Sequence, residues 1–136
     1  MDALSRLLWG WDARLHAPDQ FGRVFVVTGA NSGLGAEAAL RLAERRATVV
    51  MGVRSLADGA RAAEAIRARV AGAKLLVAHV DVASFTSVRA FASRVDASFP
   101  GGVHALINNA GVLNPPGRPA VTDDGLEVRT FGGGGG

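Results

Sequence analysis

The sequence predicts an α/β fold, in which a doubly wound parallel sheet lies between two layers of helices. Short apolar runs rich in β-branched residues alternate with longer alanine- and leucine-rich segments, and this alternation is typical of parallel βαβ units. The first apolar run leads through a glycine-rich turn directly into a helical segment. Right-handed crossovers between successive strands then predict the strand order 3-2-1-4.

The first βαβ unit follows a leader at residues 1–20. Arg23–Thr28 is the predicted first strand, because four consecutive apolar residues read as a strand buried on both faces. Gly33–Arg46 is the predicted first helix, which contains no proline and no glycine after Gly35. Ala47–Val53 is the predicted second strand.

The next helix is expected over Leu56–Ala71 and ends at Gly72. Ser55 is a plausible N-cap for it. Asp58 lies in its first turn, where the helix dipole favours a carboxylate.

Lys74–Val80 is the predicted third strand. Ser84 is expected to cap a third helix that runs through Phe99 and is closed by the Pro-Gly-Gly at 100–102. Val103–Ile107 is the predicted fourth strand, and the chain is expected to become irregular after Gly111. We therefore expect one partial domain over 21–131, followed by the polyglycine tail at 132–136, which has no side chains to bury.

The glycine turn between the first strand and first helix is the main candidate site. A strand, a glycine turn and a helix together aim free backbone N–H groups and a helix N-terminus at a phosphate. Gly29 allows the tight turn, Gly33 lets the backbone approach a pyrophosphate, and Gly35 lets the helix pack near the strand. Asn31 and Ser32 offer polar side chains near the phosphates, or serve only the turn itself.

Two motifs carry a resemblance to a known family. Thr28–Gly35 resembles the TGxxxGxG signature of the short-chain dehydrogenase/reductases, and Asn108–Gly111 resembles their NNAG motif. Thr122–Glu127, taken with Ala30–Gly35, is similar to the retinol-dehydrogenase-like branch. The resemblance covers about Phe21 to Phe131 and implies the amino-terminal part of a Rossmann-type fold that binds a nicotinamide dinucleotide.

The residue that follows the second strand indicates whether NAD or NADP binds. NAD enzymes place an Asp or Glu there for the ribose 2′-OH, whereas this chain has Arg54. A guanidinium matches a 2′-phosphate, and the resemblance also implies NADP; the alternative is a solvated arginine. Asp81–Val82 resembles the family's adenine contact, although Asp81 could instead cap the following segment. The predicted cofactor-binding residues are Gly29, Asn31, Ser32, Gly33, Leu34, Gly35, Arg54, Asp81, Val82, Asn108, Ala110 and Gly111.

The resemblance implies hydride transfer between nicotinamide and an alcohol or carbonyl, with a tyrosine as acid/base and a nearby lysine. The sequence has no tyrosine, and its lysine, Lys74, is expected at the start of the third strand. We therefore expect an oxidoreductase that lacks the catalytic half, from an incomplete gene model or a truncated isoform. The alternative is an inactive nucleotide-binding module with a regulatory role. His16, His79 and His104 are isolated, so no catalytic or metal-ligating residue is assigned.

The amino-acid composition bears on the partners, the chemistry and the location of the protein. The net charge is +3, but the arginines are scattered among acidic residues, which argues against a nucleic-acid partner. The absence of cysteine excludes disulfides and thiolate catalysis. Met1–Trp11 lacks the long apolar region of a signal peptide. We expect a cytoplasmic protein, with peripheral membrane attachment through Met1–Trp11 as the alternative.

Overall fold

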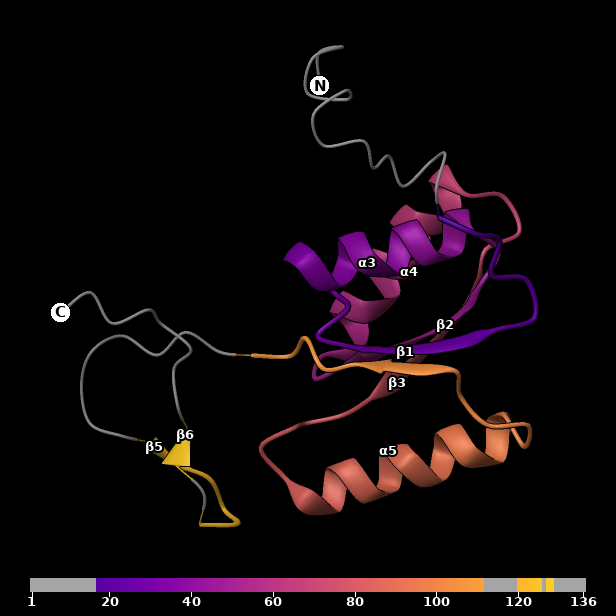
Figure 1. Ribbon diagram of the computed structural model, residues 1–136. Coiled ribbons are helices and arrows are strands. Elements are labelled where there is room, and N and C mark those ends of the chain that lie inside the picture. The colour runs from indigo at the N-terminus through magenta and orange to yellow at the C-terminus, as the bar shows by residue number, and fades with distance from the viewer. Residues whose placement is uncertain (1–16, 112–119, 126, 129–136) are drawn as a thin grey trace, which may run out of the picture.

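The structure is a computed structural model that describes residues 17–111, 120–125 and 127–128. Its main body is a sheet with helices on both faces (Figure 1). The greater part of the predicted leader, with Met1–Trp11 and His16, lies outside the described residues, as does the predicted polyglycine tail. Among the described helices, none combines the length and the apolar content that crossing a membrane would require.

The sheet has the predicted order. It contains β1 (Val24–Thr28), β2 (Thr48–Val53), β3 (Lys74–His79) and β4 (Ala105–Ile107), arranged β3-β2-β1-β4. Every pair in this sheet is parallel. The carboxyl ends of its strands therefore meet at one edge, where Thr28 of β1 is followed by the glycine turn.

Helices cover the sheet on both faces. In Figure 1, α3 (Gly33–Glu44) and α4 (Leu56–Arg69) lie on one side and α5 (Phe85–Ser98) lies on the other. The predicted serine caps are confirmed. The Ser55 Oγ accepts a hydrogen bond from Asp58 N at 3.3 Å, and the Ser84 Oγ accepts one from Ser87 N at 3.3 Å.

Several helices and strands are shorter than predicted. α3 ends at Glu44 because the chain then reverses, with Arg46 in the left-handed region at φ 65°. α4 ends at Arg69 because Val70 is already extended at φ −124°, ψ 97°. The fourth strand is shorter than Val103–Ile107, because its pairing with β1 begins only where Ala105 faces Phe25.

The other strands and α5 are also slightly shorter than predicted. β1 starts at Val24 and β2 at Thr48, because their pairing begins with these two residues opposite each other. β3 ends at His79, which pairs with Val53, the last residue of β2. α5 ends at Ser98, because Phe99 is its C-cap.

The hydrophobic core consists of two layers, one on each face of the sheet. Val27, Val49 and Met51 are fully buried on the face that α3 and α4 cover. Val26 and Val50, their sequence neighbours, pack on the opposite face together with residues of α5. Successive strand residues point to opposite faces, so both faces need apolar side chains. This explains why the sequences of β1 and β2 are nearly continuous apolar runs.

The segment after Gly111 differs from the prediction that it is irregular. β5 (Ala120–Val121) and β6 (Glu127–Val128) form an antiparallel pair. The intervening chain turns with Gly125 N donating to Thr122 O at 2.9 Å. The prediction missed this pair because strands of two residues carry no recognisable periodicity.

Candidate dinucleotide-binding site

The glycine turn leaves the carboxyl end of β1 and enters α3. Gly29 has a φ of +67° and Gly33 a φ of +54°. Residues other than glycine rarely adopt such values. The Gly29 N–H donates to Gly52 O at 2.8 Å, which ties the turn to β2. The glycines at these two positions are thus required by the backbone path itself.

Thr28, at the end of β1, and Asn109, just after β4, brace this turn. The Thr28 Oγ1 accepts hydrogen bonds from Asn109 N at 3.1 Å and from Ala110 N at 3.0 Å, and donates to Ile107 O at 3.4 Å. The Asn109 Nδ2 donates to Thr28 O at 3.1 Å and to Gly29 O at 3.3 Å. The two sequence motifs therefore form one hydrogen-bonded unit at the carboxyl edge of the sheet.

Two of the glycines also allow close approach within this unit. A Cβ on Gly29 would lie 2.9 Å from the Ala110 Cα. A Cβ on Gly35 would overlap the Gly29 carbonyl oxygen and lie 2.5 Å from the Asn109 Nδ2. Side chains at either position would push the turn, α3 and the end of β4 apart.

The amino terminus of α3 is open. Its N-cap residue, Ser32, makes no side-chain capping hydrogen bond, unlike the serines that cap α4 and α5. A Cβ on Gly33 would meet nothing within 4 Å, and Leu34 beside it is 83% exposed. The first N–H groups of a helix have no partner within that helix. An accessible surface of such groups is the environment that a pyrophosphate requires, so the residues present fit the expected dinucleotide.

The remaining predicted site residues lie at the same edge. Arg54 is exposed directly after β2. Asp81 is half-buried after β3, and Val82 is 54% exposed. The Asp81 Oδ1 accepts a hydrogen bond from Ala83 N at 2.9 Å, so its carboxylate takes part in the local turn that we considered as the alternative to adenine binding.

The NNAG segment divides into two kinds of residue. Asn108 and Gly111 are exposed, whereas Asn109 and Ala110 are half-buried against the glycine turn. Our predicted binding set included Asn108 and omitted Asn109, whose side chain makes the bracing contacts. Both asparagines lie beyond β4, which ends at Ile107, so the strand pattern offered no signal for this contact.

Comparison with known proteins places these features in a family. The profile of the short chain dehydrogenases matches residues 23–128, which span the glycine turn and the NNAG segment. The chain belongs to the short-chain dehydrogenase family. Proteins of this family are oxidoreductases that bind nicotinamide dinucleotides.

Curated relatives include retinol dehydrogenases. The chain is 43% identical to retinol dehydrogenase 12 of Mus musculus over 107 residues, which cover 79% of this chain and 33% of the relative. It is 40% identical to the short-chain dehydrogenase/reductase ffsI of Aspergillus flavipes over 121 residues, covering 83% of this chain and 35% of the relative. The chain thus spans about a third of the length of these relatives.

Solved structures of the family share the fold. An uncharacterized protein from Mycobacterium Paratuberculosis superposes with a TM-score of 0.70 at 42% identity, covering 86% of this chain and 39% of that protein. A metagenomic short-chain oxidoreductase, solved in complex with NADP, superposes with a TM-score of 0.64 at 35% identity. That superposition covers 69% of this chain and 41% of the oxidoreductase.

Two basic residues lie at the amino edge of the sheet, at the opposite end of the strands from the glycine turn. Lys74 starts β3 opposite Thr48, at the amino edge of the sheet. The His104 Nδ1 accepts a hydrogen bond from Val24 N at 3.0 Å, at the same edge. Lys74 is thus at the start of the third strand, as predicted.

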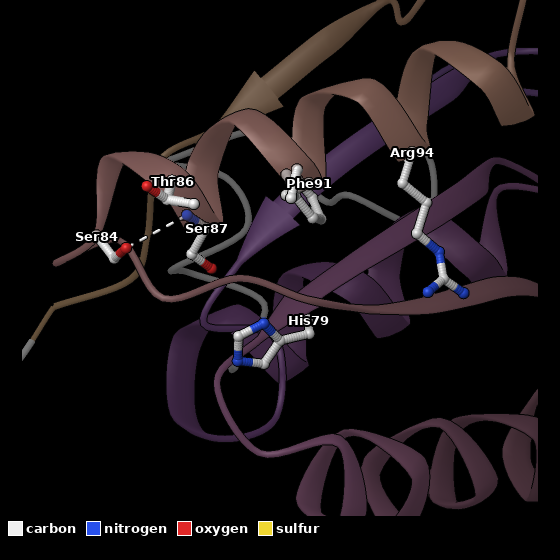
Figure 2. A pocket seen from close by; sticks show the side chains of 7 residues that line it. His79, Ser84, Thr86, Ser87, Phe91 and Arg94 are labelled. Carbon is white, nitrogen blue, oxygen red and sulfur yellow. Dashed lines mark hydrogen bonds between the residues drawn. The ribbon is translucent and has the colours of Figure 1, made fainter.

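A hollow of about 440 Å³ lies along α5 beside the end of β3. Figure 2 shows His79 on the β3 side and Arg94 reaching from α5 on the other. The hollow is lined by His79, Ser84, Thr86, Ser87, Ala90, Phe91 and Arg94. None of these belongs to the predicted cofactor-binding set.

Proposed function

We propose that this chain binds NADP(H) and is the dinucleotide-binding part of an oxidoreductase that acts on an alcohol or carbonyl substrate. The observation that carries the proposal is the open amino terminus of α3 above the braced glycine turn. Gly33 leaves room there for an approaching group, and Ser32 leaves the first turn uncapped by a side chain. Backbone N–H groups of this turn would hold the pyrophosphate.

The side chains around the turn complete the proposed site. Asn31 and Ser32 would contribute polar atoms beside the phosphates, and the exposed Leu34 would provide apolar contact. Gly35 would keep α3 close enough to the turn for the N–H groups of the helix to reach the ligand. The lack of space for a Cβ at Gly35 supports this role. Asn108, Ala110 and Gly111 would line the adjacent channel where β4 leaves the sheet.

Arg54 is the proposed determinant of cofactor choice. It is exposed at the end of β2, and its planar guanidinium can pair with both oxygens of a 2′-phosphate. The NADP-bound metagenomic relative supports this choice. Asp81 and Val82, at the end of β3, would contact the adenine.

The substrate class rests on the retinol dehydrogenase relatives. A bound nicotinamide would supply hydride chemistry. Protonation of the substrate oxygen requires a positioned acid, typically worth about 10²–10⁴-fold in rate. The 136-residue sequence contains no tyrosine, the acid that the family resemblance implies. We therefore expect this chain by itself to bind the dinucleotide without turning over retinal or short aldehydes.

The proposal is tested by fluorescence titration with NADPH and NADH. Gly33→Val would place a branched side chain in the open space at the turn and strain a left-handed residue, so NADPH binding should be lost. Arg54→Ala should weaken NADPH binding about ten- to a hundredfold, as expected for a charge-assisted contact, with little effect on NADH. Arg61→Ala, at an exposed arginine of α4, is the matched control. Unchanged NADPH affinity in Gly33→Val would refute the site, and equal affinity of the unmodified chain for both dinucleotides would refute the role of Arg54.

A further inference from the structure

The acidic segment between β5 and β6 contacts an element far from it in sequence. The Asp124 Oδ2 accepts a hydrogen bond from Phe85 N at 2.6 Å across a separation of 39 residues. Phe85 is the first residue of α5. A carboxylate at a helix amino terminus interacts favourably with the dipole and with an N–H that lacks a partner within the helix. Asp124 is thus a cap supplied from another part of the chain.

The first turn of α5 in turn holds the loop after β3. The Ser87 Oγ accepts a hydrogen bond from Asp81 N at 2.8 Å, and Ser84 N donates to Asp81 O at 3.1 Å. Ser84 also caps Ser87 N (Figure 2). The position of Asp81 therefore depends directly on where the start of α5 lies.

We propose that Asp124 is a positioning residue for the adenine half of the dinucleotide site. By fixing the amino terminus of α5, its carboxylate holds Asp81 and Val82 in place at the carboxyl edge of the sheet. The pyrophosphate half of the site, at the glycine turn, is braced separately by Thr28 and Asn109. This inference rests on the proposed dinucleotide binding and assigns a role to the segment with the retinol-dehydrogenase-like motif.

The separate bracing of the two halves allows a specific test on the full 136-residue chain. The probes are 2′,5′-ADP, which carries the adenine half, and inorganic pyrophosphate, which reports on the glycine turn. Isothermal titration should show that Asp124→Ala weakens 2′,5′-ADP binding about fivefold, the size of effect expected for one lost capping interaction. Pyrophosphate affinity should not change. Asp124→Asn should retain most of the 2′,5′-ADP affinity, because its amide oxygen can accept the same hydrogen bond.

Asp123→Ala is the matched control, since Asp123 is the exposed neighbour of Asp124, and it should bind both probes normally. Unchanged 2′,5′-ADP affinity in Asp124→Ala, or equal weakening of both probes, would overturn the proposal. Hydrogen exchange at the Phe85 amide provides a readout without ligand. Exchange should accelerate in Asp124→Ala and not in Asp123→Ala, and its failure to do so would refute the cap itself. An unmodified chain that binds neither probe would refute the proposed function and this inference with it, whatever the exchange result.

Discussion

At the scale of single residues, Thr28 connects the two motifs of the family. It is 6% exposed, and its hydroxyl contacts backbone groups of Ile107, Asn109 and Ala110. A buried N–H left without an acceptor costs more free energy than an ordinary hydrogen bond contributes. Thr28 should therefore matter for stability as well as for the shape of the turn.

Replacement of Thr28 by valine tests this role. The two side chains have nearly the same shape, but valine leaves the N–H groups of Asn109 and Ala110 without their acceptor. We expect the free energy of unfolding in urea to fall by about 2–3 kcal/mol. Thr28→Ser, which keeps the hydroxyl, should lose less than half as much, and equal losses in the two variants would show that the hydroxyl does not brace the turn.

At the scale of elements, the packing of α4 on the sheet depends on Gly59. This glycine is buried inside the helix, where an alanine would ordinarily be favoured by about 1 kcal/mol. A Cβ at this position would lie 2.6 Å from the Val53 Cγ2 and 2.7 Å from the Val77 Cγ1. Both valines belong to strands, so the helix would have to move away from β2 and β3.

We therefore expect Gly59→Ala to destabilise the chain. Overpacking of this kind costs about 1–3 kcal/mol, which should exceed the gain in helix propensity and leave a net loss of about 1 kcal/mol. Thermal unfolding followed by circular dichroism measures the change. Ala65→Gly, at an exposed position of the same helix, isolates the propensity contribution. Stabilisation by Gly59→Ala would show that α4 is not held this close to the sheet.

At the scale of the whole molecule, β4 is an edge strand. Among the described residues it pairs with β1 alone, and Leu106 in its centre is 55% exposed. An apolar edge strand presents N–H and C=O groups to the strands of other chains. The expressed 136-residue chain should therefore self-associate through this edge.

Leu106→Lys should reduce that association, because a charged side chain on an edge strand disfavours pairing with a second chain. Sedimentation velocity over a concentration series should show a smaller associated fraction than for the unmodified chain. Leu56→Lys is the control, since Leu56 is 51% exposed but lies at the start of α4. The same association in all three proteins would exclude the β4 edge as the contact.

The strand order, the serine caps of α4 and α5, and the glycine turn between β1 and α3 were all predicted from the sequence. The caps and the turn follow from local patterns, because capping residues and glycines act on their immediate neighbours in the chain. The strand order follows from the alternation of strands and helices, because crossovers between parallel strands are right-handed. The contacts of Asn109 and Asp124, in contrast, could be found only in the folded structure. Asn109 contacts Gly29 across 80 residues, and Asp124 reaches Phe85 across 39. No periodicity encodes such a pairing, because it exists only once separate elements have packed at the same edge of the sheet.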